Sequence, residues 1–68
     1  MQEQIERAAA LVTSWEQSLG YNERSLSEAF EPVDLAYYRD NAEACRHNIA
    51  VHQAILASLK ELEASTIP

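Results

Sequence analysis

Cys45 and His52 are the side chains in this sequence with the widest range of possible chemistry. They are seven residues apart, so within a helix they share one face. A thiolate and an imidazole are zinc ligands, and a symmetric dimer could bring two such pairs together. A thiol that packs as a small hydrophobe and a histidine at a helix crossing explain the same spacing more simply. We therefore predict packing for Cys45 and, for His52, a polar position that fixes register or partner choice.

Catalysis by Cys45 would require a base beside the thiol inside a cleft. A chain of 68 residues that forms two helices, as argued below, offers no such cleft. We predict that the protein is not an enzyme, and that it has no catalytic residues, no metal and no cofactor.

Acidic side chains gather between residues 23 and 34, with only Arg24 among them. They are Glu23, Glu28, Glu31 and Asp34. Such a cluster is usually a solvated surface. It also suits a nucleic-acid mimic, an acidic inhibitor of the phage type that occupies the groove of a nucleic-acid-binding enzyme. This is the alternative function that the sequence leaves open.

The charge balance excludes several classes of partner. Eleven acidic residues against five basic ones give a formal net charge of −6. Phosphate backbones and anionic lipids repel such a chain, so we expect no direct binding to nucleic acid or membrane. The longest apolar run, residues 8–12, is far shorter than the ~20 residues of a membrane span. Because no basic leader precedes it and the one cysteine suits a reducing compartment, we predict a cytoplasmic protein.

The composition predicts an all-α chain that forms one domain, residues 1–68. One glycine and two prolines leave few helix breakers. Helix 1 is predicted over about 2–19, with Gly20 as its left-handed C-terminal cap. Its apolar positions step by three and four residues, as one helix face requires: Ile5, Ala8, Val12, Trp15 and Leu19.

The connection is predicted to contain a short helical turn at about 26–31. Ser25 and Glu28 form the S-x-x-E pattern that starts helices. Helix 2 follows Pro32 over about 33–64, which completes an antiparallel helical hairpin. Aromatic residues around the connection are expected to form a small satellite core: Tyr21, Phe30, Tyr37 and Tyr38.

The predicted helix 2 carries two apolar stripes. The first steps by three and four residues and consists of Leu35, Tyr38, Ala42, Cys45, Ile49, His52, Leu56 and Leu59. The second runs beside it and consists of Ala44, Val51, Ile55 and Leu62. One stripe fits one neighbouring helix, whereas two adjacent stripes need a bundle of three or more helices.

Helix 2 is also predicted to be longer than helix 1. Lengths of about 46 Å and 27 Å leave roughly 19 Å of helix 2 uncovered near its C-terminal end. We predict the partner-binding surface there, formed by Val51, His52, Ile55, Leu56, Leu59 and Leu62. A chain this short cannot bury them alone, so we expect a homo-oligomer or a complex with another helical protein.

Pro32 precedes the predicted helix 2, Tyr38-Arg39 lies in its first turns, and Ala42-Glu43-Ala44 follows. In these features, over about half of its length, the chain resembles the small co-chaperones of needle subunits in type III secretion systems. Those proteins are acidic, alanine-rich helical hairpins with a short turn, whereas about a dozen residues connect the predicted helices here. The resemblance implies a cytoplasmic protein that pairs with a larger, repeat-type chaperone. Together the two would keep a polymerising needle subunit monomeric.

The sequence therefore favours a small acidic helical binding module, an adaptor or chaperone that packs a partner helix along helix 2. The acidic inhibitor is the alternative. The two functions differ in their contact surface, which is the apolar helix 2 in the first case and the acidic connection in the second.

Overall fold

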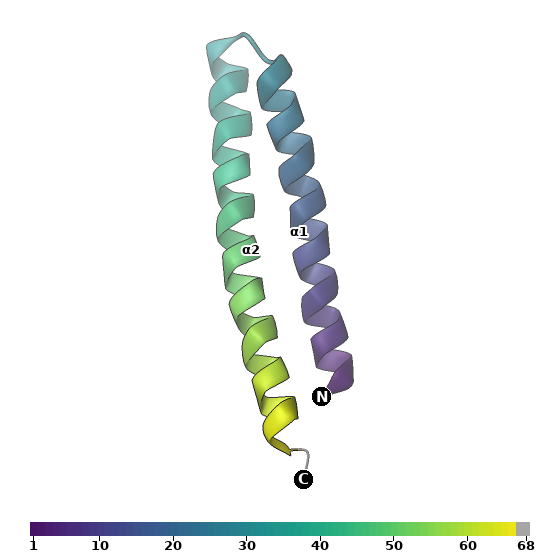
Figure 1. Ribbon diagram of the computed structural model, residues 1–68. Helices are drawn as coiled ribbons and strands as arrows, with labels where there is room; N and C mark the ends of the chain where they lie inside the picture. Colours follow the sequence, from purple (N-terminus) through teal and green to yellow (C-terminus); the bar gives the residue numbers. More distant parts are fainter. Residues whose placement is uncertain (67–68) are drawn as a thin grey trace.

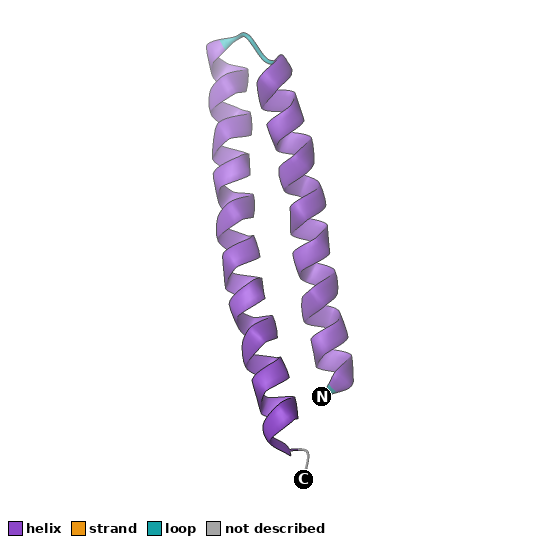
Figure 2. Ribbon diagram, viewed as in Figure 1, coloured by secondary structure: helices purple, strands orange, loops and turns teal. Residues whose placement is uncertain are grey.

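The computed structural model describes residues 1–66, which form an all-α antiparallel hairpin (Figure 1). Helix α1 spans Gln2–Glu28 and helix α2 spans Pro32–Thr66. No strand occurs in this part of the chain (Figure 2). The hairpin is long and thin, with principal extents of 58 × 14 × 12 Å. The predicted fold class, an all-α helical hairpin, is confirmed.

Helix α1 continues through Gly20, so the prediction that helix 1 ends at residue 19 is wrong. Gly20 does not have a positive φ and is an ordinary helical residue, not a left-handed cap. Glycine in a helix interior costs about 1 kcal/mol relative to alanine. Packing against α2 offsets this cost, because Leu19, Asn22 and Leu26 on either side of Gly20 are buried or half-buried.

The connection between the helices contains only three residues, 29–31. The N–H of Ala29 donates to the carbonyl oxygens of Ser25 at 2.9 Å and Leu26 at 3.3 Å, which closes the last turn of α1. Ser25 therefore lies inside α1. The predicted separate helical turn at 26–31, with its S-x-x-E start, is wrong.

Helix α2 begins at Pro32, one residue before the predicted start, and ends at Thr66, two residues after the predicted end. Proline suits the first helical position because its φ is already helical and its missing N–H needs no partner. Asp34 lies in the first turn, where a carboxylate meets the positive end of the helix dipole. The N–H of Leu35 donates to the carbonyl of Glu31 at 2.9 Å and completes this turn.

The two helices meet along one seam, which steps by three and four residues on each. On α1 and its C-cap, Ala29, the seam residues are Ile5, Ala8, Val12, Trp15, Leu19, Asn22, Leu26 and Ala29 itself. On α2 they are Tyr38, Ala42, Cys45, Ile49, His52, Leu56, Leu59 and Glu63. No large side chain among the described residues is fully buried, so the core is thin. Within residues 1–66, neither helix is long and apolar enough to cross a membrane.

Candidate protein-binding face

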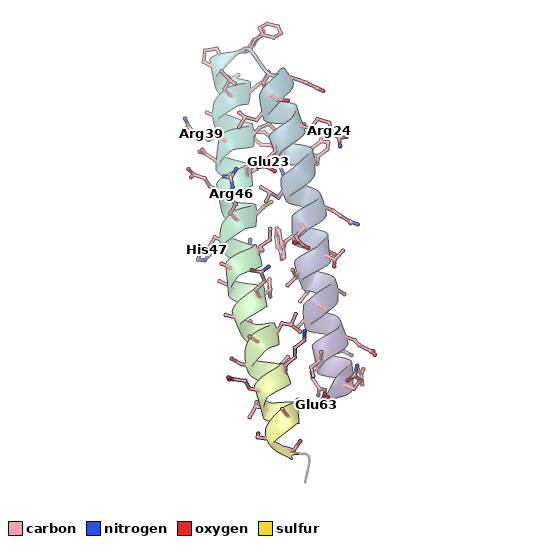
Figure 3. All side chains as sticks on the ribbon, viewed as in Figure 1. Glu23, Arg24, Arg39, Arg46, His47 and Glu63 are labelled. Atoms are coloured by element: carbon pink, nitrogen blue, oxygen red, sulfur yellow. The ribbon has the colours of Figure 1, made fainter. Side chains whose placement is uncertain are left out.

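Two side-chain contacts between the helices show which residues of α1 lie opposite which residues of α2. Nδ2 of Asn22 lies 4.0 Å from Sγ of Cys45, and Nη2 of Arg46 donates to Oε2 of Glu23 at 3.2 Å (Figure 3). The residue numbers add up to 67 in the first pair and 69 in the second. Because the helices are antiparallel, numbers fall on one helix as they rise on the other, so from these two contacts we infer that residues whose numbers add up to about 68 lie at similar levels.

Asn22 and Cys45 form a polar layer in the seam. Both are buried, and Asn22 is the one buried polar residue in the described part of the chain. Its Nδ2 also donates to the carbonyl oxygen of Ser18 at 2.8 Å, so the amide group has two acceptors. A single polar layer in an apolar helix contact costs some stability and disfavours other alignments. Asn22 lies beyond the predicted end of helix 1 at residue 19, so it was not predicted as a seam residue. The steps from Leu19 through Asn22 to Leu26 nevertheless continue the spacing of the apolar pattern.

His52 lies in the seam, half-buried at the level of Trp15 on α1. Cys45 lies two helical turns away, about 10 Å along the axis, so within one chain the two side chains share a face but not a site. His47 points away from α1 (Figure 3). In residues 1–66 no group of three or more His, Cys, Asp or Glu is placed to hold a metal ion. The role predicted for His52, fixing register or partner choice, stays a prediction.

The predicted partner-binding residues divide between two sides of α2. Three belong to the seam and are half-buried: His52, Leu56 and Leu59. Three face solvent: Val51 (41% exposed), Ile55 (45%) and Leu62 (53%). Helix α1 has 27 residues instead of the predicted 18, so it is only eight residues, about 12 Å, shorter than α2 and packs against Leu56 and Leu59 in the seam. The large predicted overhang is therefore wrong, and the second stripe of α2 is the part that α1 leaves free.

The free stripe of α2 continues across the hairpin onto α1. In an antiparallel pair, residues that precede seam positions lie on one side and residues that follow them lie on the other. Glu23 and Arg46 both follow seam residues, and their ion pair marks the second side. Leu11 and Ile55 both precede seam residues, so they stand together on the first side, at the same level. Leu11 is 46% exposed, nearly the same as Ile55.

Over residues 4–25 of α1 and 41–62 of α2, this first side of the hairpin carries no acidic residue. On α1 it consists of Gln4, Arg7, Leu11, Ser14, Ser18, Tyr21 and Ser25. On α2 it consists of Asn41, Ala44, Asn48, Val51, Ile55, Ser58 and Leu62. We call these fourteen residues the acid-free face. Its one charged member, Arg7, is paired with Glu3 at 2.9 Å, one turn away on α1, and a shallow surface hollow on α1 is lined by Arg7, Ala10, Leu11 and Ser14.

The opposite side of the hairpin is charged. Over the same length it carries six charged residues: Glu6, Glu16, Glu23, Glu43, Arg46 and Lys60. One more acid, Glu63, ends the seam beside the start of α1 (Figure 3), where the free amides of a helix N-terminus favour a carboxylate. A partner that covers the acid-free face therefore avoids the desolvation of carboxylates, which every contact with the opposite side would involve.

The tip of the hairpin exposes aromatic and acidic side chains. Phe30 is 85% exposed, and Tyr21 and Tyr37 also face solvent. Tyr38 is half-buried in the seam. The centroids of its ring and of the Tyr37 ring are 5.2 Å apart, in an edge-to-face arrangement. The predicted satellite core is wrong, because a three-residue turn supplies no third element to cover the rings. Three exposed acids surround the tip: Glu28, Glu31 and Asp34.

No protein-family model, curated protein or solved structure matches the chain. The acid-free face and the acidic tip are thus the two surfaces from which a function can be inferred. They lie on different parts of the hairpin, so substitutions can change one without the other.

Proposed function

We propose that the protein is a non-enzymatic helix-binding module, an adaptor or chaperone that packs a helical partner against the acid-free face. The main support is the placement of Leu11 and Ile55 at one level, on the same side, both nearly half exposed. Val51 and Leu62 extend this apolar surface along α2. A helix laid along this face would meet these side chains with its own residues at steps of three and four.

Four side chains supply most of the expected binding free energy. Fully burying a leucine, isoleucine or valine contributes about 1.5–3 kcal/mol. Leu11, Val51, Ile55 and Leu62 are each about half exposed, so each has about 1 kcal/mol still to contribute. Their sum, about 4 kcal/mol, corresponds to roughly three powers of ten in Kd, or about half of the binding free energy of a micromolar complex. One charged substitution among them removes about 1 kcal/mol of this sum and also buries an unpaired charge, so it should weaken a micromolar interaction strongly.

The resemblance to needle co-chaperones gives this proposal its most specific form. In that form the partner is a larger, repeat-type chaperone, and the complex keeps a polymerising needle subunit monomeric in the cytoplasm. The connection of three residues fits the short turn of those proteins better than the dozen residues expected from the sequence. A co-chaperone of this kind would present its acid-free face to the larger chaperone.

The alternative is an acidic inhibitor that uses the tip of the hairpin. Its candidate residues are Glu23, Glu28, Glu31 and Asp34. Arg46 pairs with Glu23 at 3.2 Å and offsets one of the four carboxylates. Phe30, the most exposed large side chain there, has no counterpart on a nucleic-acid backbone. We therefore prefer the acid-free face as the functional surface.

Affinity capture from the native host separates the two functions. One variant, Ile55→Lys, alters the acid-free face. A second variant neutralises the tip with Glu23→Gln, Glu28→Gln, Glu31→Gln and Asp34→Asn. A helix-binding module should lose its partner, identified by mass spectrometry, in the first variant and keep it in the second. The reverse pattern would assign the function to the tip, and circular dichroism checks that both variants remain helical.

A further inference from the structure

We propose that a second copy of the chain covers the acid-free face when no other partner is present, giving a two-fold symmetric four-helix bundle. This inference rests on the proposed function, because it takes the same face as the association surface and names its first occupant. Its support comes from the direction, the charge and the area of that face.

The direction of the face suits a second hairpin. At about 100° per residue, the stripe on each helix lies about 100° around the axis from the seam, because each of its residues precedes a seam residue. This is close to the right angle between neighbouring contacts in a four-helix bundle, where each helix packs against two others. Every residue of both stripes precedes a seam position, so in an antiparallel pair both stripes lie on the same side of the hairpin, where Leu11 and Ile55 are nearly half exposed. A single partner helix in the groove would leave the outer positions, such as Val51 and Ser14, without cover, whereas a second hairpin reaches both stripes.

The charge of the face suits a second copy in particular. Each chain carries a formal net charge of −6, so two copies repel each other unless they meet where acids are absent. The acid-free face holds one charged residue, Arg7, whose charge is offset by Glu3 on the same helix. The opposite side would bring twelve charged residues from two copies into contact, six from each. Self-association through the acid-free face is therefore the arrangement with the least repulsion and desolvation.

The area of the face is sufficient for a weak dimer. Each stripe spans 22 residues, 4–25 on α1 and 41–62 on α2, or about 32 Å of helix. Two helices side by side are about 20 Å wide, so the face covers about 640 Å² on each copy. The total of about 1,300 Å² lies at the lower end of the range for specific interfaces. We expect a dimer with a Kd in the micromolar range.

The thin core gives the chain a reason to associate. The buried apolar residues are few and mostly small: Ile5, Ala8, Val12, Ala42 and Cys45. A two-helix chain of 68 residues has no third layer of its own to cover the large aliphatic side chains of the acid-free face. A second hairpin would supply that layer.

Sedimentation velocity of the full chain from one to several hundred micromolar tests the inference with three variants. Ile55→Lys places a charge at the centre of the face. Ser58→Lys places a charge at an exposed position of the same face, three residues further along α2, and removes no apolar contact of the monomer. Gln53→Lys is the matched control, because it introduces the same charge at an exposed position on the opposite side. The side chain of glutamine is similar in length to that of lysine. Circular dichroism reports whether each variant keeps its helices.

The wild type and Gln53→Lys should sediment as dimers at tens of micromolar. Ile55→Lys and Ser58→Lys should sediment as folded monomers, with Kd raised about 100-fold or more by charges desolvated on both copies. If Ile55→Lys loses its helices, Ser58→Lys alone decides the outcome. A wild type that is monomeric at several hundred micromolar overturns the inference, and so does a dimer that Gln53→Lys disrupts and Ser58→Lys leaves intact.

The failure of this inference and the failure of the proposed function can be told apart. A monomeric wild type whose captured partner is lost in Ile55→Lys overturns the second copy and keeps the helix-binding module. A dimer that Ile55→Lys disrupts, while capture of the partner is unchanged, keeps the second copy and overturns the proposed function.

Discussion

Substitution of Gly20 by alanine should stabilise the hairpin. Gly20 has a helical φ in the interior of α1, and a Cβ added there meets no atom within 4 Å. Alanine therefore gains the full helix-propensity difference, about 1 kcal/mol, with no steric cost. For a domain of this size, that gain raises Tm by roughly 4–8 °C. With a urea m-value of about 1 kcal/mol/M, the unfolding midpoint should rise by about 1 M.

Urea and thermal unfolding, followed by circular dichroism at 222 nm and one fixed protein concentration, measure this change. Ala9→Gly is the control, because Ala9 is exposed in the same helix, and it should lower stability by a similar amount, about 1 kcal/mol. If Gly20 were instead a left-handed cap at the end of a shorter helix, Gly20→Ala would destabilise the chain by about 1 kcal/mol or more. A loss of stability in Gly20→Ala would thus refute the continuous helix.

Two further predictions concern the seam and its surroundings. Val12→Ala removes a buried side chain and should lower the unfolding free energy by about 2 kcal/mol. Leu11→Ala, one residue away on the acid-free face, should lower the unfolding free energy of the monomer by less than half of that amount and should weaken the dimer. Equal losses in urea unfolding of the two variants would contradict the division between seam and face. The Glu23–Arg46 pair is half exposed. A double-mutant cycle with Glu23→Gln and Arg46→Gln should therefore give a coupling free energy below about 1 kcal/mol that falls with added salt. A larger coupling free energy that does not depend on salt would show that this pair holds the register.

The hairpin and most of the α2 seam could be predicted from the sequence because the apolar pattern there meets no conflicting signal. The steps from Tyr38 to Leu59 predict one contact face, and in the structure those residues are buried or half-buried. The end of α1 could not be predicted in the same way. Gly20 is a local signal for a helix end and the S-x-x-E pattern at Ser25 is a local signal for a new helix start, each worth about 1 kcal/mol. Seam contacts with α2 outweigh them, and these contacts exist only once the two helices have come together.

The predicted binding site depended on that error in the helix boundary. A helix 1 that ends at residue 19 leaves the seam around Leu56 and Leu59 uncovered, so the seam and the second stripe looked like one surface. Once α1 extends to Glu28, the seam is closed and Ile55 remains on a different side. His52 is then a half-buried residue of the hairpin's own seam, at the level of Trp15.

The acid-free face is visible only when both helices are considered together. On α1 it contains one large aliphatic residue, Leu11, among serines and other polar residues, a pattern that a solvated helix surface would also show. On α2 it contains Val51, Ile55 and Leu62, which the sequence predicts as part of a second apolar stripe. The sequence pattern of α2 alone does not predict which residues of α1 lie beside that stripe. The register set by Asn22 and Cys45 places Leu11 beside Ile55, and the charges of both helices then fall on the other side. Two weak patterns become one surface because the turn and the polar layer bring them to the same level, and that surface is where a charge should matter most to association.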